Sequence, residues 1–421
     1  MESAVQSLTK SQAAELERQM KVISRGVVDL LPEDEFREKL ACSIRDNVPL
    51  RIKQGFDPTA PDIHLGHTIG IRKLKQFQML GHKIVLIVGD YTALVGDPSG
   101  RSATRPVLSY EDIAKNAETY QDQFFKILDR SVTEVHSNGE WFRKMDFAEI
   151  INLTARFTVA RILERDDFEK RFKAGLPISV HELLYPLMQA YDSFAIKADL
   201  ELGATEQKFN LLAGRTIQES YGMTPQCILT LPVLVGVDGE KRMSKSIGNY
   251  IGIDESPTEI FGKVMSIPDN LIYQYFELAT DVSLERLAEV KQMLDSGKVN
   301  PMEVKKQLGE TLVDMYCPVG SGKEARAEFE RVFSKGQLPD DIPELTTAQL
   351  QDLELDPSKL YLVHLIAKSN LSKSNSEARK LIEAGSVSID GEKVTSVDYE
   401  FALASEIVLK VGKRRFLRLK P

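Results

Sequence analysis

The amino-acid sequence predicts an α/β domain with a parallel sheet, followed by a helical region and a small mixed α+β domain. The first observation is a strand, a turn-rich loop, an amphipathic helix and a second strand within about forty residues, which is the order of a βαβ unit. The second is helical periodicity through almost all of residues 255–335. The third is a compact final segment, residues 358–421, in which glycines separate short apolar runs.

The elements of the βαβ unit follow one another from the N-terminal side. Residues 1–47 carry apolar side chains at helical spacing and predict helices. Residues 50–52 predict the first strand, and residues 67–80 predict the helix of the unit, with Gly81 as its stop signal. Residues 84–88 are continuously apolar, as in a parallel strand that is covered on both faces.

The rest of the first domain continues this alternation. We expect helices over residues 110–129, 147–173 and 181–197, and an apolar strand over residues 227–235. These elements assign residues 1–250 to one α/β domain with N-terminal helices.

Three segments are expected after it. Residues 251–335 predict a helical domain. Residues 336–357 contain six acidic residues, three prolines and no lysine or arginine, and we expect a linker there. Residues 358–421 predict a small domain of their own.

Composition excludes several classes of protein. The 421 residues are 42% hydrophobic and 28% charged, which argues against disorder and against a membrane protein. The longest apolar runs have the length of a buried strand, and the first residues lack the pattern of an export signal. The three cysteines lie far apart, without the spacing of a disulfide framework or zinc site. We therefore expect a cytoplasmic protein with no membrane partner and no protein-bound metal or organic cofactor.

Charge is distributed unevenly along the chain. The 54 lysines and arginines and 62 acidic residues give a net charge of −8. Residues 358–421 hold twelve basic and seven acidic residues, a net of +5, so the remainder carries 42 − 55 = −13. A basic domain attached to an acidic body indicates a polyanionic partner bound at that end, with a chance excess in a short domain as the alternative.

The first chemical motif is His64-Leu65-Gly66-His67, at the start of the helix of the βαβ unit. Histidines at positions i and i+3 share one face of a helix. The opening turn also presents unpaired backbone N–H groups and the positive end of the helix dipole, which suit phosphate. Gly66 permits the close approach of a base or ribose. The alternative is a chance pair of surface histidines.

The second motif is Lys241-Arg242-Met243-Ser244-Lys245-Ser246, with turn-forming residues on both sides. Such residues predict a mobile loop, whose cations can close over a polyphosphate and offset the charge that develops when it leaves. The alternative is a solvated basic turn. The order of the two motifs, about 180 residues apart, favours a shared nucleotide site.

The two motifs resemble the HIGH and KMSKS signatures of class I aminoacyl-tRNA synthetases. Gly55-Phe56-Asp57-Pro58-Thr59-Ala60, Gly96-Asp97-Pro98-Ser99-Gly100 and residues 185–192 resemble segments of the bacterial tyrosyl-tRNA synthetases in particular. The last 60 or so residues resemble an α-L RNA-binding fold that a small-subunit ribosomal protein shares. The resemblance covers nearly the whole chain.

This resemblance implies a fold, an activity and a set of partners. The fold is a Rossmann-like nucleotide-binding catalytic domain with a parallel sheet, then a helical anticodon-recognition domain and the RNA-binding domain. The activity is tyrosine activation by ATP, with Mg²⁺ accompanying ATP as substrate, and transfer of tyrosine to the 3′-terminal ribose of tRNA(Tyr). The relatives are homodimers, so a homodimer is expected. Tryptophanyl-tRNA synthetase-like activity and a non-catalytic RNA-binding paralogue are the alternatives.

A polar stripe on one expected helix carries specificity in this interpretation. Tyr185, Gln189 and Asp192 stand at positions i, i+4 and i+7, on one face of the helix. Buried polar groups need partners, and a substrate can supply them, although such residues can also tie a helix to its neighbours. A site that hydrogen-bonds a phenol rejects phenylalanine, and tyrosine-activating enzymes are the standard example of this effect.

The resemblance also implies roles for individual residues. Asp192 is expected to accept the tyrosine hydroxyl, and Tyr185, Gln189 and Asp97 to hold its ammonium group. Further residues are expected to line the amino-acid pocket: Asp57, Thr92 and Gln207. Others are expected around the nucleotide: Thr59, His64, Gly66, His67, Glu206, Arg242, Met243, Ser244 and Lys245. The tRNA is expected to contact Arg101, Arg105, Lys413, Arg414, Arg415 and Arg418, with Phe416 as a hydrophobic anchor.

Three departures from the family pattern accompany these expectations. Lys53 stands where many relatives have a tyrosine, which leaves the second hydroxyl contact of those relatives without its usual group. Ala204 and Glu206 stand where the family has glycine and aspartate, so the ribose-binding carboxylate is one methylene farther out. Arg242 replaces the first lysine of KMSKS and keeps its charge but not its geometry.

Overall fold

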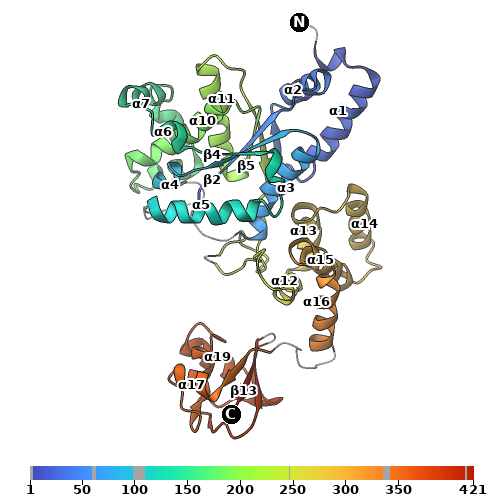
Figure 1. The fold of residues 1–421 in the computed structure, drawn as a ribbon, viewed down its shortest axis with the longest axis vertical. Helices are drawn as coiled ribbons and strands as arrows, with labels where there is room; N and C mark the ends of the chain where they lie inside the picture. Colours follow the sequence, from blue (N-terminus) through green and yellow to red (C-terminus); the bar gives the residue numbers. More distant parts are fainter. Residues whose placement is uncertain (1–2, 59–62, 98–109, 246, 335–341, 413–414) are drawn as a thin grey trace. The chain divides into compact units, whose positions relative to one another are not determined.

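The computed structural model describes residues 3–58, 63–97, 110–245, 247–334, 342–412 and 415–421. The chain divides into two compact units, Met1–Val319 and Gly320–Pro421, and each is described here by itself. Figure 1 shows the ribbon coloured along the sequence.

The first unit is built on a mixed sheet. Among the described residues, six strands lie in the order β1-β6-β5-β2-β3-β4; β1 pairs antiparallel with β6 and all other neighbours are parallel. Their bounds are β1 Asp29–Leu31, β2 Arg51–Phe56, β3 Lys83–Val88, β4 Thr133–Ser137, β5 Leu200–Ala204 and β6 Cys227–Leu231. The sheet confirms the predicted α/β class.

Helices cover both faces of this sheet. In Figure 1, α10 and α11 lie on one side of the strands and α3 and α5 on the other. The helices up to the sixth strand are α1 Lys10–Ile23, α2 Glu33–Asp46, α3 Leu65–Met79, α4 Thr92–Val95, α5 Tyr110–Phe124, α6 Gly139–Phe142, α7 Phe147–Thr154, α8 Val159–Ile162, α9 Asp166–Lys173, α10 Tyr185–Ala195 and α11 Lys208–Ser220. Residues 84–88 of β3 and all of β6 are buried, as expected for strands between two helical layers.

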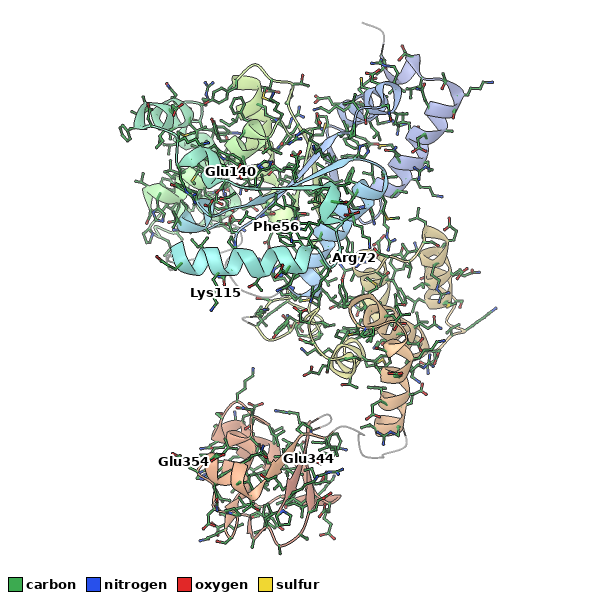
Figure 2. All side chains as sticks on the ribbon, viewed as in Figure 1. Phe56, Arg72, Lys115, Glu140, Glu344 and Glu354 are labelled. Carbon is green, nitrogen blue, oxygen red and sulfur yellow. The ribbon has the colours of Figure 1, made fainter. Side chains whose placement is uncertain are left out.

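The strand order has a topological switch point between β2 and β5. The chain proceeds from β2 to β3 and β4, then returns to the other side of β2 to form β5 and β6. In open α/β sheets, ligands bind outside the carboxyl ends of the strands where the order reverses. Phe56, labelled in Figure 2, is the last residue of β2 at this end.

The prediction of one helix over residues 147–173 was wrong, because this range holds three separate helices. The structure has three helices there, because Asp146 caps α7 through Glu149 and the Thr158 side chain accepts from the backbone N–H of Arg161 at the start of α8. These N-caps satisfy helix ends that a continuous helix would not expose. The short strands β1, β4 and β5 were not predicted.

Residues 257–316, the last part of the first unit, form helices and no strands. Its helices are α12 Pro257–Val264, α13 Ile272–Ala279, α14 Leu284–Asp295 and α15 Pro301–Tyr316. Arg25, which follows α1, donates to the backbone carbonyls of Phe276, Glu277, Thr280 and Val282 and so ties the N-terminal region to the end of α13. No helix among the described residues is long and apolar enough to cross a membrane.

The second unit is a small α+β assembly. After α16 Ser321–Phe329, its described residues form a five-stranded sheet in the order β10-β9-β12-β13-β7 and a two-stranded pair, β11-β8. The strands are β7 Glu344–Thr346, β8 Leu360–Tyr361, β9 Val387–Ile389, β10 Glu392–Val394, β11 Glu400–Phe401, β12 Ile407–Val411 and β13 Arg415–Lys420; the remaining helices are α17 Thr347–Asp352, α18 Leu362–Lys368 and α19 Asn375–Glu383.

The expected linker over residues 336–357 needs a correction. Glu344, labelled in Figure 2, begins β7, which pairs in parallel with β13, and α17 follows at once. Leu350 and Leu355 are buried in the core of this unit. The acidic composition concealed these elements, because four of the acidic residues are exposed around the two buried leucines: Glu344, Asp352, Glu354 and Asp356.

Candidate active site

The two histidines of the first motif open α3 at the carboxyl end of β2. His64 is the N-cap residue in extended conformation, and its backbone N–H donates to Nδ1 of His67 at 3.4 Å. The two imidazole rings stack with centroids 3.8 Å apart. The next backbone group, the N–H of Leu65, donates to the carbonyl of Ile251 at 2.9 Å. The motif is therefore tied to a segment nearly 190 residues downstream.

That downstream segment directly follows the second motif, residues 241–246, whose own backbone is also held by hydrogen bonds. The N–H of Met243 donates to the carbonyl of Leu234 at 2.8 Å, and the N–H of Ser244 donates to Oδ1 of Asn249 at 2.8 Å. A Cβ added at Gly66 would lie 3.0 Å from the His64 ring and 3.5 Å from Cβ of Met243. The structure thus brings the two motifs side by side, and Gly66 is required where they approach.

Burial and neighbouring charge keep both imidazoles neutral. Burial, reinforced by His67 and Lys245, lowers the pKa of His64 to about 3. Burial and Lys245 lower the pKa of His67 to about 4. At neutral pH each ring therefore offers one N–H donor without a charge, and the charge beside them comes from Lys245.

The loop cations have different surroundings. Arg242 donates to Glu206 Oε2 at 2.9 Å, in a pair whose side chains are 41% and 38% exposed. Nζ of Lys245 lies 5.8 Å from the centroid of the Tyr250 ring, over which Lys263 also lies at 4.8 Å. The residues expected to bind ribose and pyrophosphate, Glu206 and Arg242, thus face each other in this structure.

The predicted polar stripe lies on α10, and its first residue joins the end of β2. Tyr185 donates its hydroxyl proton to Oδ2 of Asp57 at 2.9 Å, and Thr92 donates to Oδ1 of the same carboxylate at 2.7 Å. Tyr185 is buried, and this burial, with Asp57 nearby, raises its pKa well above the usual value. Three predicted pocket residues therefore form one hydrogen-bonded group.

Asp192 ends the stripe, among donors that the sequence analysis did not identify. Trp141 Nε1 donates to its Oδ1 at 2.9 Å, and Asn138 Nδ2 donates to its Oδ2 at 3.4 Å. Burial raises the pKa of Asp192 to about 7, although Lys53, Trp141 and Asn138 act to lower it. Asn138 and Trp141 come directly after β4. Had that polar strand been predicted, both residues would have been expected at its carboxyl end, near the site.

A chain of side chains connects the middle of the stripe to the remaining predicted residues. Gln189 accepts from Asn210 at 2.9 Å, and Asn210 accepts from Arg165 at 2.6 Å. Arg165 lies 3.7 Å from Asp97, which accepts from Gln207 at 3.3 Å. Asn210 and Arg165 were not predicted as site residues. They link Gln189 to Asp97 and Gln207 in one network.

Several predicted residues belong to the second unit or lie outside the described residues. Thr59, Arg101, Arg105, Lys413 and Arg414 lie outside the described residues. In the second unit, Arg415 donates to the carbonyl of Leu371, and Arg418 faces Glu344 and Glu406. Phe416 is buried with Val332 and Ile342, so it packs inside the unit and is not an exposed anchor.

Comparison with known proteins also divides the chain in two, with the boundary between residues 334 and 340. Residues 45–334 match the family described as "tRNA synthetases class I (W and Y)", and residues 340–419 match the "Tyrosine--tRNA ligase SYY-like C-terminal domain". The chain is 49% identical over 406 residues to the tyrosine–tRNA ligase of Carboxydothermus hydrogenoformans, covering 96% of this chain and 98% of that protein. It is 50% identical over 401 residues to the tyrosine–tRNA ligase of Geobacter sulfurreducens, covering 95% and 98%.

Solved structures agree at the level of the fold. The tyrosyl-tRNA synthetase of Archaeoglobus fulgidus complexed with L-tyrosine has a TM-score of 0.61 at 23% identity, covering 74% of this chain and 99% of that one. A C-terminally truncated mitochondrial tyrosyl-tRNA synthetase of Aspergillus nidulans has a TM-score of 0.60 at 20% identity, covering 77% and 95%. With a match over residues 45–334 and about half of all positions identical to curated relatives, the chain belongs to the class I tRNA synthetases of the tryptophan and tyrosine group.

Proposed function

We propose that this chain is a tyrosine–tRNA ligase, which activates L-tyrosine with ATP and transfers it to tRNA(Tyr). The observation that carries the proposal is identity of about half over nearly the full length of tyrosine–tRNA ligases. The match of residues 340–419 to a tyrosine–tRNA ligase domain favours tyrosine over the tryptophan alternative. The two motifs proposed to bind phosphate, residues 64–67 and 241–246, lie close together near the switch point of the sheet. Their proximity favours a catalytically active enzyme over a non-catalytic paralogue.

The first half-reaction needs positioning and charge stabilisation. A carboxylate oxygen of tyrosine attacks the α-phosphorus of Mg-ATP in line; the new O–P bond forms as pyrophosphate leaves with the electrons of the broken bond. No protein nucleophile or base is required. His64 and His67 donate neutral hydrogen bonds to the phosphates, with Thr59 beside them, while Arg242 and Lys245 offset charge on the leaving pyrophosphate.

The tyrosine substrate is held by the α10 network. Asp192 accepts the phenol hydroxyl proton in a hydrogen bond, at the position where Trp141 and Asn138 already orient its carboxylate. Tyr185, Gln189 and Asp97 hold the ammonium group, and three residues complete the pocket: Asp57, Thr92 and Gln207. The ordered partners of these groups support the proposal, because a pre-formed pocket spends little free energy on ordering when it binds.

The nucleotide is proposed to enter between the two motifs. Glu206 binds the ribose hydroxyls and Gly66 gives the base and ribose their closest backbone approach. Met243, Ser244 and Lys245 cover the phosphates from the loop side. Binding then requires that ribose displace Arg242 from Glu206, which frees the guanidinium for the pyrophosphate.

Transfer of tyrosine uses tRNA contacts that the second unit supplies. Arg415 and Arg418 lie on β13 with Lys413 and Arg414 before them in sequence, and Arg101 and Arg105 are proposed near the acceptor end. The net charge of +5 over residues 358–421 supports this role. Deletion of residues 335–421 should spare pyrophosphate exchange and impair tRNA charging. The deletion starts before residue 344 because β7 and α17 belong to this unit.

We also propose a homodimer acting in the cytoplasm, where tRNA charging serves protein synthesis. Large apolar side chains are exposed over α7 to α10: Phe147, Ile151, Val159, Phe172, Leu176 and Val180. Exposed large apolar side chains that form one patch are typical of an interface, and we propose that these side chains form one. Phe147→Asp should yield a smaller particle by analytical ultracentrifugation, whereas an unchanged dimer would place the interface elsewhere.

The experiment that tests the activity is tyrosine-dependent exchange between pyrophosphate and ATP, measured with each of the twenty amino acids in the absence of tRNA. We expect exchange with tyrosine alone. Exchange with tryptophan would support the alternative substrate, and no exchange with any amino acid would support the non-catalytic alternative. A second assay, tyrosine attachment to tRNA, separates activation from transfer.

A further inference from the structure

A buried ion pair lies directly beneath the proposed tyrosine pocket. Lys53 on β2 stands opposite Glu201 on β5 in the parallel register, at the switch point of the sheet. Lys53 Nζ lies 2.9 Å from Glu201 Oε1, and both side chains are 0% exposed. Lys53 stands where the family resemblance expects a tyrosine, and in this structure its ammonium group is paired with Glu201.

All hydrogen-bonding groups of this pair have partners on α10 or beside it. Lys53 donates to the backbone carbonyl of Gln189 at 2.9 Å and to the hydroxyl of Ser193 at 2.7 Å. Glu201 accepts from the Gln189 side chain at 3.0 Å, from Ser193 at 2.9 Å and from Gln226 at 2.5 Å. These hydrogen bonds hold the buried pair in one geometry. Removing either partner would leave the other as an uncompensated buried charge.

The first consequence concerns the orientation of Gln189. Its backbone carbonyl is held by Lys53, its amide nitrogen by Glu201, and its amide oxygen by Asn210. The amide oxygen still has a second lone pair with which to accept a proton from the substrate ammonium. The ion pair therefore determines which atom of Gln189 the pocket presents.

The second consequence concerns Asp192, the neighbour of Ser193. Charged groups reach Asp192 from two strands: Lys53 on β2 lowers its pKa and Glu201 on β5 raises it. The groups facing it from the β4–α6 side, Asn138 and Trp141, are neutral donors. On α10 itself Tyr185 is a neutral phenol that holds Asp57. Substitution of Lys53 should therefore raise the pKa of Asp192, and substitution of Glu201 should lower it.

We infer that Lys53 and Glu201 are positioning residues for tyrosine recognition, because together they fix the carbonyl and amide of Gln189 and the hydroxyl of Ser193, the residue next to Asp192. This inference deepens the proposed function and rests on it. It assigns a role to the pair beyond holding β2, β5 and α10 together, and that difference is measurable.

The test compares the pH profiles of three variants in tyrosine-dependent pyrophosphate exchange. Lys53→Met removes the positive charge and should move the acid limb of kcat/KM for tyrosine to higher pH. Glu201→Gln removes the negative charge and should move the limb to lower pH, with a KM for tyrosine raised about tenfold and the KM for ATP unchanged. The double variant should return the acid limb close to that of the unsubstituted protein.

A matched control comes from another buried ion pair. Arg171 and Glu182 lie 2.6 Å apart, with each side chain 4% exposed, and their described hydrogen bonds include those with Pro177 and Ser179, which are not pocket residues. Glu182→Gln should lower the melting temperature without moving the acid limb or the KM for tyrosine. If Lys53→Met does not fold, Glu201→Gln and the control decide the question by themselves.

Two results would overturn the inference: acid limbs that shift in the same direction in both single variants, or a Glu201→Gln profile that coincides with the control. Each would reduce the pair to a structural role. Failure of the proposed function has a different signature, because the unsubstituted protein would then show no exchange with tyrosine at any pH.

Discussion

The two sides of the site are built differently. On the amino-acid side, side chains hold side chains: Asp57, Tyr185, Gln189 and Asp192 are each bonded to at least one other side chain. On the nucleotide side, a backbone bond joins the first motif to Ile251, just after the second motif, and the Arg242 side chain in the loop is 41% exposed. In the proposed function, this difference gives substrate selection to a network of hydrogen-bonded side chains and charge stabilisation to groups that can rearrange around a polyphosphate.

The largest expected effect breaks the nucleotide side alone. His67→Ala removes a neutral donor aimed at the phosphates and should slow adenylate formation by about 10²- to 10³-fold, while tyrosine binding is nearly unchanged. Pre-steady-state kinetics measures the rate and equilibrium dialysis the binding. The control is His364→Ala, at an exposed histidine of the second unit. An unchanged adenylation rate in His67→Ala would remove this histidine from the mechanism.

The next effect breaks the amino-acid side alone. Asp192→Ala removes the acceptor of the phenol proton and should lower kcat/KM for tyrosine by about 10- to 100-fold, because a hydrogen bond to a charged group is lost. The KM for ATP should stay the same. Steady-state exchange at varied tyrosine and varied ATP separates the two. Equal losses for both substrates would contradict the division between the two sides.

A pH titration sharpens the comparison without any substitution. The pKa of Asp192 is raised to about 7, whereas the pKa values of His64 and His67 are lowered to about 3 and 4. As pH falls below 7, Asp192 gains a proton, so kcat/KM for tyrosine should fall about tenfold per pH unit. The imidazoles stay neutral between pH 7 and 5, so adenylation at saturating tyrosine should stay nearly constant there. A fall in both quantities at pH 7 would assign the titration to the nucleotide side.

The smallest expected effect concerns the contact between loop and ribose site. Glu206→Gln weakens an exposed pair with Arg242 and should alter the KM for ATP by about two- to fivefold, since exposed ion pairs contribute little. The KM for tyrosine should not change. Raising the salt concentration should reduce the difference from the unsubstituted protein. A loss above a hundredfold would mean that Glu206 does more than hold this loop and ribose.

The same contrast explains what the sequence could predict. β3 and α3 were predicted correctly because their buried positions carry apolar residues, so burial is visible in the sequence pattern itself. β5 was missed because its second residue, Glu201, has the charge of an exposed residue, while its partner Lys53 is about 150 positions away in the sequence. β4 was missed because its sequence, Thr133-Glu134-Val135-His136-Ser137, is polar at the sheet edge. Asn138 and Trp141 were missed with it.

Trp141 is the chain's single tryptophan, and its indole N–H is bonded to Asp192. Indole emission responds to the charge and hydrogen bonding of its surroundings, so this one fluorophore reports the state of the phenol-binding carboxylate without any label. Quenching or a spectral shift on addition of tyrosine, with little response to ATP alone, would give a direct optical titration of one half of the site.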